Sequence, residues 1–117
     1  MTADKFMMKK LERALEQCGG IFTLEDIKEH LQDGRMQGHV VGDTWAITQI
    51  LEWPRSKSVN VVFVVGEMKD ALELEAVIEK WAKNLGASFI TGTGRDGWWD
   101  FKTPGWKKMG ILYSKDI

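Results

Sequence analysis

Few side chains in this 117-residue sequence have the type and spacing that catalysis needs. General acid–base chemistry needs a histidine or a carboxylate that is held beside the reacting atoms. His39 stands before a tight turn, and four carboxylates stand beside glycine-rich turns, namely Glu67, Asp70, Asp96 and Asp100. None of them belongs to a nucleophile elbow or a P-loop. The sequence therefore predicts no catalytic residue.

A glycine-rich segment has one spacing that is associated with phosphate binding. Residues 92–97 match the pattern G-x-G-x-x-G, in which glycines let the backbone approach a pyrophosphate. In a dinucleotide site, this turn lies in a βαβ unit with a downstream acidic residue that binds the ribose. No such unit follows here, so the spacing alone is weak evidence and predicts no dinucleotide site.

The same part of the chain is rich in tryptophan. Trp98, Trp99 and Trp106 fall within nine residues, among glycines and charges. Trp98 and Trp106 could pack on the sheet as a corner of the core. Alternatively, the segment is a contact surface, because adjacent tryptophans cannot both face one side of a helix or strand, and exposed tryptophan beside arginine is typical of interface anchors. The candidate surface comprises Trp99, Arg95, Trp106 and Lys107.

Composition limits the classes of partner. The chain is 44% hydrophobic and 28% charged, with a net charge of −1, which is ordinary for one globular domain. A net charge near zero gives no long-range field that attracts nucleic acid, so nucleic acid is disfavoured. A local basic patch stays open as an alternative; its residues are Arg55, Lys57, Arg95, Lys107 and Lys108.

Metal and membrane sites are also disfavoured. Cys18 is the only cysteine, and the two histidines, His30 and His39, lack neighbouring ligands, so no metal site is expected. No apolar run reaches the roughly 20 residues that cross a bilayer, and no signal peptide begins the sequence. We therefore expect a cytoplasmic protein without membrane contact.

The N-terminal part predicts two helices. Apolar residues recur at helical spacing over residues 3–18, and Gly19-Gly20 supplies a stop. Because two glycines form a hinge, this helix can pack on its own sheet or on a neighbour, which makes Phe6, Met7 and Leu11 a second candidate contact surface. Thr23 and Asp26 predict a capping box at the start of the second helix, which Gly34 ends.

The remaining elements predict an α+β domain. Residues 36–53 indicate a hairpin, the apolar run 59–65 a central strand, and residues 87–91 and 110–114 two further strands. A short helical turn is expected at 98–102. Trp45 and Trp53 share one strand face and are expected in the core. A helix over 70–85, with Asp70 as its N-cap, is expected to cover the sheet through Leu72, Leu74, Val77, Ile78, Trp81, Ala82 and Leu85.

The order of these motifs resembles a known family. It is carried by residues 22–27 with Gly34-Arg35, residues 52–55, residues 64–66, and residues 94–98 with 104–106. Over residues 21–115 the chain resembles the GNAT acyltransferases, and in particular the small GNAT-like proteins of tailed bacteriophages and related particles. The resemblance implies a GNAT-like mixed sheet flanked by helices in residues 21–117, preceded by an N-terminal helix and Gly-Gly hinge in residues 1–20.

The resemblance also shows what is missing. The family binds the pyrophosphate of acetyl-CoA at a helix N-terminus with the pattern Arg/Gln-x-x-Gly-x-Gly/Ala. At the matching position this chain has residues 66–71, in which Glu67 and Asp70 would face the phosphates, with Gly66 and Lys69 as the other loop residues. Two like charges about 4 Å apart repel by about 4 kcal/mol at an effective dielectric constant of about 20. We therefore expect a degenerate acyl-CoA loop and no cofactor.

Two functions follow as expectations. The preferred one is a non-enzymatic phage protein that acts through protein contacts in virion structure, assembly or DNA ejection. Its partners would be other phage proteins or copies of itself, in the cytoplasm of a bacterial host or within the virion. The alternative is an active N-acyltransferase that uses acetyl-CoA, in which the backbone amides of residues 66–71 still bind an anion.

Overall fold

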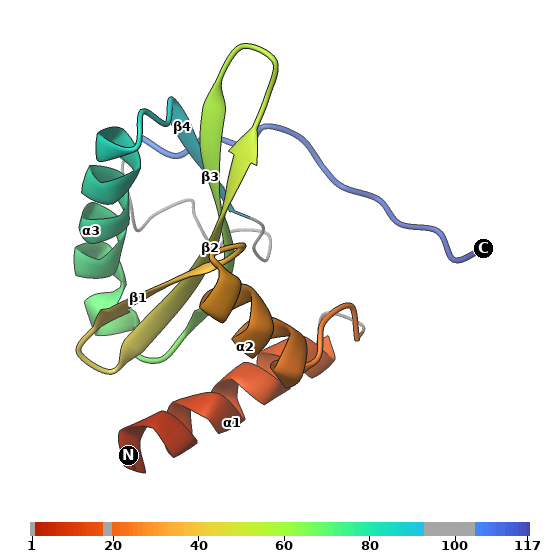
Figure 1. Ribbon diagram of the computed structural model, residues 1–117, viewed down its shortest axis with the longest axis vertical. Helices are drawn as coiled ribbons and strands as arrows, with labels where there is room; N and C mark the ends of the chain where they lie inside the picture. Colours follow the sequence, from red (N-terminus) through yellow and green to blue (C-terminus); the bar gives the residue numbers. More distant parts are fainter. Residues whose placement is uncertain (1, 18–19, 93–104) are drawn as a thin grey trace.

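The computed structural model describes residues 2–17, 20–92 and 105–117 (Figure 1). It confirms an α+β fold in which a mixed four-stranded sheet lies between helices. In chain order, the elements are α1 (Thr2–Gln17), α2 (Leu24–Asp33), β1 (Gln37–Val41), β2 (Thr44–Glu52), β3 (Lys57–Val65), the 3-10 turn η1 (Met68–Asp70), α3 (Ala71–Asn84) and β4 (Phe89–Gly92).

The strand order in the sheet is β1-β2-β3-β4. The first two pairs are antiparallel, whereas β3 and β4 are parallel and pair from Ser58–Phe89 to Val61–Gly92. The apolar strand β3 therefore has a neighbour on each side, as its almost wholly apolar, valine-rich sequence predicted. Because a parallel pair needs a crossover, α3 connects β3 to β4 across one face of the sheet.

A β-bulge interrupts the pairing of β2 with β3. Ile47 pairs with Phe63, but the next residue, Thr48, pairs with Val61, so Val62 is the extra residue. A bulge disturbs the alternation of side chains between the two faces. This shift lets Phe63 join the core on the face opposite to α3.

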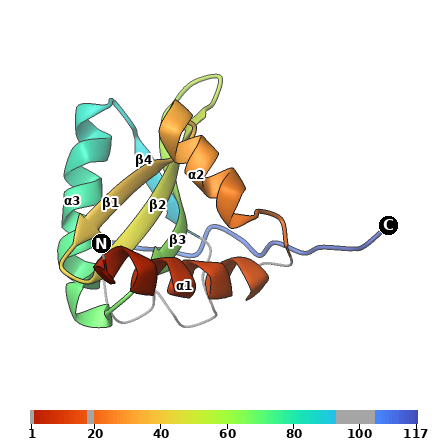
Figure 2. The ribbon, with the colours of Figure 1, turned by 60° about the horizontal axis from the view of Figure 1, so that its bottom comes forward.

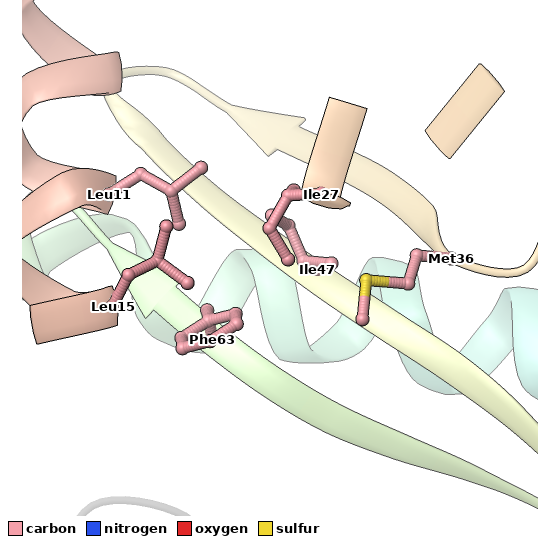
Figure 3. Close-up of a cluster of buried hydrophobic side chains, with 6 residues drawn as sticks. All are labelled: Leu11, Leu15, Ile27, Met36, Ile47 and Phe63. Atoms are coloured by element: carbon pink, nitrogen blue, oxygen red, sulfur yellow. The ribbon is translucent and has the colours of Figure 1, made fainter. Parts of the chain in front are cut away.

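The sheet has a separate hydrophobic core on each face. Figure 2 shows α1 and α2 on one side and α3 on the other. The core under α1 and α2 consists of Leu11, Leu15, Ile27, Met36, Ile47 and Phe63 (Figure 3). The core under α3 consists of Ala46, Val59, Leu74, Ile78 and Ala82.

The second helix begins and ends as its sequence predicted. The Thr23 hydroxyl accepts a hydrogen bond from the Asp26 N–H at 3.2 Å, and the Asp26 carboxylate accepts one from the Thr23 N–H at 2.9 Å. This reciprocal capping box confirms the expected N-terminus. Gly34 ends the helix with φ of 85°, a conformation that favours glycine.

Some residues that the sequence placed in the core are exposed, on α3 and at the end of β2. On α3, Leu72 and Val77 are exposed, because only the stripe through Leu74, Ile78 and Ala82 faces the sheet. Trp45 is partly buried, but Trp53 is 51% exposed. Trp53 stands at the end of the β2–β3 hairpin, which projects beyond the helices, so no helix covers it (Figure 1).

The expected strand at 110–114 is wrong. Residues 107–117 form no helix or strand, and every one of them is exposed. They leave the body of the protein as an extended chain (Figure 1). Strand propensity stabilises a strand only where a neighbouring strand supplies hydrogen bonds and side-chain contacts, and this segment has none among the described residues. The helical turn expected at 98–102 lies outside the described residues.

Candidate functional site at the end of β3

The candidate site lies where β3 ends and the chain turns into α3. The pairing of β3 with β4 stops at Val61, whereas β3 itself continues to Val65. Residues 66–70 then connect β3 to α3, beside the turn between β1 and β2. In open sheets with parallel strands, ligands bind outside the carboxyl ends of the strands. Residues 66–70 are thus the place in this fold to test for a ligand.

Gly66 holds this connection tightly against the β1–β2 turn. Its φ is 127°, and a Cβ atom placed on it would lie 2.2 Å from the Asp43 carbonyl oxygen and 2.6 Å from the Thr44 Cα. Those distances are far below any van der Waals contact, and both neighbours are backbone atoms that cannot turn away. Only glycine fits here, and its role is close packing within the chain.

Thr44 forms a two-way hydrogen bond with the same connection. Its side chain is buried, and its hydroxyl donates to the Glu67 carbonyl oxygen at 2.7 Å while accepting from the Glu67 N–H at 3.0 Å. The Asp70 N–H donates in turn to the Glu67 carbonyl oxygen at 3.2 Å. Two N–H groups of residues 66–70 therefore have partners inside the protein.

Asp70 serves the turn and does not cap α3. The expected capping hydrogen bond is missing from its side chain, whose carboxylate instead accepts a hydrogen bond from the Asp43 N–H at 3.4 Å. Its oxygen also lies 2.8 Å from the point where a Cβ atom on Gly42 would stand. The backbone of Asp70 is helical, with φ of −92° and ψ of −5°, whereas an N-cap residue normally has extended backbone angles.

The connection and the adjacent turn carry more negative than positive side chains. The connection and the adjacent turn carry the carboxylates of Asp43, Glu67 and Asp70 against the single ammonium group of Lys69. A pyrophosphate would meet negative charge and would have to displace the hydrogen bonds of Thr44 and Glu67. Thr44 was missed by the sequence reasoning, although its place directly after the Gly42-Asp43 turn was an available signal.

His39 is the other titratable group that the sequence singled out. Its Nε2 lies 3.0 Å from the hydroxyl oxygen of the buried Thr48, and its ring meets the Trp81 ring edge-on at a centroid distance of 4.6 Å. Burial lowers the pKa of His39 below its ordinary value. These neighbours connect β1 to α3, and they include no carboxylate that would pair with His39 as in a catalytic dyad.

The residues expected to contact partners are placed only in part. Trp106 is partly buried and donates its indole N–H to the Glu75 carboxylate on α3. Lys107 next to it is exposed. Arg95 and Trp99 lie outside the described residues, and their part of the contact surface stays a prediction.

The first helix packs on the protein's own sheet. Leu11 is only 1% exposed and lies in the core with Phe63, so its side chain packs within this chain (Figure 3). Its helix thus shares a core with residues that follow Gly20. The side chains of Phe6 and Met7 lie outside the described part of the chain.

Two further findings concern metals and membranes. Within residues 2–17, 20–92 and 105–117, no three His, Cys, Asp or Glu side chains gather in a way that could hold a metal ion. Among the described helices, none combines the length and apolar character that crossing a membrane requires.

Comparison with known proteins places the fold. No protein-family model matches the sequence, and no curated protein matches it. Among solved structures, a tetramutant of the BH1408 protein from Bacillus halodurans has a TM-score of 0.67 at 10% identity, over 95% of this chain and 90% of that one.

Two named acetyltransferases are also similar in structure. An aminoglycoside acetyltransferase from an uncultured soil metagenomic sample, solved with sisomicin, has a TM-score of 0.64 at 10% identity, over 98% of this chain and 90% of that one. A ribosomal-protein-alanine N-acetyltransferase from Brucella melitensis has a TM-score of 0.51 at 17% identity, over 91% and 93%. At such identities the likeness concerns the fold alone, and the fold of this protein is that of the GNAT acetyltransferases.

Proposed function

We propose that this GNAT-fold protein acts through contacts with other proteins and not through acetyl-CoA. The observation that carries the proposal is that residues 66–70 form hydrogen bonds within the protein. The N–H groups of Glu67 and Asp70 already donate to Thr44 and to the Glu67 carbonyl oxygen, where a GNAT enzyme presents N–H groups to a pyrophosphate.

Energetics support this proposal. Removing the partner of a buried polar group costs about 1–3 kcal/mol, and Thr44 exchanges two hydrogen bonds with Glu67. A phosphate about 4 Å from one carboxylate adds a repulsion of about 4 kcal/mol at an effective dielectric constant of about 20. Lys69 offsets only part of this repulsion. The geometry of the loop thus favours its internal contacts over a diphosphate.

Thermal unfolding with and without about 1 mM acetyl-CoA tests the proposal. A ligand at about 100 times its Kd stabilises a protein by about 2.7 kcal/mol, which would raise the Tm of this domain by roughly ten degrees. We expect no shift. Micromolar binding in a calorimeter would contradict the proposal and favour the alternative function, an active N-acyltransferase.

A matched variant tests whether charge repulsion or the internal hydrogen bonds would prevent the binding of acetyl-CoA. The double substitution Glu67→Gln and Asp70→Asn keeps the shape of the loop and removes two negative charges. If repulsion dominates, this variant gains weak binding of acetyl-CoA that the parent lacks. If the internal hydrogen bonds dominate, both proteins stay unbound.

The setting that we propose is the structure or assembly of a tailed phage, made in the cytoplasm of a bacterial host, with other phage proteins or copies of itself as partners. Its support is the sequence resemblance of residues 21–115. Genes for head or tail proteins beside its own gene are the expected observation. Neighbouring genes of bacterial metabolism would contradict this setting.

A further inference from the structure

The end of the β2–β3 hairpin, which projects beyond the helices, carries an aromatic ring that is fixed in place and half exposed (Figure 1). The Trp53 backbone N–H donates to the Ser56 carbonyl oxygen at 2.8 Å. The Trp53 indole N–H donates to the Ser58 hydroxyl at 2.8 Å, and Ser58 is fully buried. Trp53 itself is 51% exposed. These contacts hold the ring on the sheet while about half of its surface stays open to solvent.

A second exposed ring lies on the same face of the sheet. Ser58 pairs with Phe89 of β4, and paired residues place their side chains on one face. Phe89 is 38% exposed. Trp53 follows β2 and Phe89 belongs to β4, so the two rings stand on either side of β3, about 10 Å apart in the direction across the strands. This face thus offers two rings on which flat ligands can stack.

Polar side chains form a further row of the same face. Asn60 pairs with Gln49 on one side and with Thr91 on the other, and all three are partly buried. The Thr91 hydroxyl donates to the Asn60 Oδ1 at 3.0 Å, which fixes the orientation of this amide. Amide side chains carry both donors and acceptors, as the edges of nucleobases do.

The charge at this end of the sheet favours an anion. Arg55 in the hairpin turn is exposed and forms no ion pair with any described residue. The nearby carboxylate, Glu52, alternates to the opposite face, where it lies 3.7 Å from the Lys57 ammonium group. The Arg55 guanidinium is therefore available to a phosphate, which it binds through several N–H groups.

We infer that these residues, called the aromatic face below, bind single-stranded nucleic acid. Bases stack on Trp53 and Phe89, the amides of Gln49 and Asn60 bind base edges, and Arg55 binds a backbone phosphate. Stacking of this kind accepts every base, because every base has a flat face. An apolar protein segment on the same face would bury the two amides without partners, which is costly.

The near-zero net charge predicts how this binding responds to salt. For single strands, the logarithm of the association constant falls with the logarithm of the salt concentration by about 0.7 for each phosphate contact. With Arg55 as the main contact, we expect a slope of about −1 or shallower. Stacking then supplies most of the affinity, and a Kd on the order of 10–100 μM is expected. Such a site needs no long-range field.

Fluorescence anisotropy of a labelled oligothymidylate of about ten nucleotides tests the inference. Trp53→Leu keeps an apolar side chain but removes the ring, and we expect a Kd at least about tenfold higher. Trp53→Phe keeps a ring and should retain most of the affinity. The matched control Leu72→Ala, at an exposed apolar residue on α3, should keep the parent Kd. Equal Kd values for the leucine and phenylalanine variants would overturn stacking on Trp53.

Arg55→Gln supplies a test that does not depend on the indole hydrogen bond. Because Arg55 is exposed in the hairpin turn, the substitution leaves the sheet intact. We expect the salt slope to become shallower by about 0.7. An unchanged slope would overturn the role of Arg55.

Competing ligands distinguish a strand from other occupants. Unlabelled oligothymidylate should displace the probe, whereas polyphosphate of equal length and thymidine monophosphate should do so only at concentrations at least about tenfold higher. Equal displacement by polyphosphate would reduce the interaction to charge, and equal displacement by the monophosphate would make the ligand a free nucleotide. Either result, or no binding of the oligonucleotide at about 1 mM, overturns the inference.

Self-association is the remaining alternative, and light scattering detects it. A parent protein that dimerises while Trp53→Leu stays monomeric would give the aromatic face to a second copy and overturn the inference. The inference goes beyond the proposed protein contacts and uses no residue of 66–70. Its failure would therefore leave the expected absence of acetyl-CoA binding unchanged, and the reverse also holds.

Discussion

The connection 66–70 and residues 107–117, called the tail here, are opposite cases within one small protein. In the connection, Gly66, Glu67 and Asp70 are held by contacts with the β1–β2 turn and with Thr44 directly after it. In the tail, the large apolar side chains are mostly exposed, and Trp106 directly before it donates a hydrogen bond to Glu75 on α3. The first region makes several hydrogen bonds within the protein, whereas the second leaves its large apolar side chains mostly exposed.

This difference shows where the protein can gain from binding. A ligand at residues 66–70 must first replace hydrogen bonds that already exist, so its net gain is small. A partner at the tail replaces only water on apolar surface, and its gain grows with the area that it covers. We therefore propose that residues 66–70, where GNAT enzymes bind their cofactor, are the less suited of the two regions for binding.

The largest expected effect is at Gly66. Gly66→Ala forces a Cβ atom into the Asp43 carbonyl group and requires a left-handed backbone angle of an alanine. We expect a loss of about 3 kcal/mol or more of unfolding free energy, measured by urea unfolding. Gly110→Ala in the tail, where nothing lies within 4 Å, should change it by less than about 0.5 kcal/mol. Equal effects would contradict the contrast between the two regions.

The next largest effect is at Thr44. Thr44→Val keeps the shape of the side chain but leaves the Glu67 N–H without its partner and removes one of the two hydrogen bonds that the Glu67 carbonyl oxygen accepts. We expect a loss of about 2 kcal/mol in the same measurement. Thr44→Ser keeps the hydroxyl and should retain most of the stability. If the valine variant is as stable as the serine variant, the hydrogen bonds do not fix the connection.

A smaller effect concerns pH and His39. Because the folded protein lowers the pKa of His39, the unfolded chain binds the proton more readily. The contribution of His39 is therefore fully present above its ordinary pKa of 6.5 and is lost as the pH falls through its lower folded pKa. The unfolding free energy, measured at pH 7.5 and at pH 5.5, should fall between the two in the parent. It should fall by less in the variant His39→Gln. An equal loss in both would assign the pH dependence to other groups.

The smallest effect on folding is expected in the tail. Tyr113→Ser removes a side chain that is 83% exposed, so the stability of the monomer should change by less than about 0.5 kcal/mol. The measurement is urea unfolding. A loss comparable to that of Thr44→Val would mean that Tyr113 packs on its own chain.

The sequence predicted the elements better than their surroundings. The run of β-branched residues in β3 required a strand covered on both faces, and the Thr23–Asp26 spacing was sufficient for the capping box. The roles of Thr44 and Asp70 depend on a contact between turns far apart in the sequence, which no local pattern encodes. Trp53 and residues 110–114 have strand-like sequences, but their burial depends on neighbours that only the fold provides.

The mixed sheet also has a consequence for the order in which the chain folds. Strands β1, β2 and β3 are joined by short turns, so their contacts are local in sequence and close quickly. The pair β3–β4 joins residues about thirty positions apart and must wait for the loop closure that α3 spans. We therefore expect β1, β2 and β3 to form their pairs first. β4 then pairs with β3 in a slower, final step.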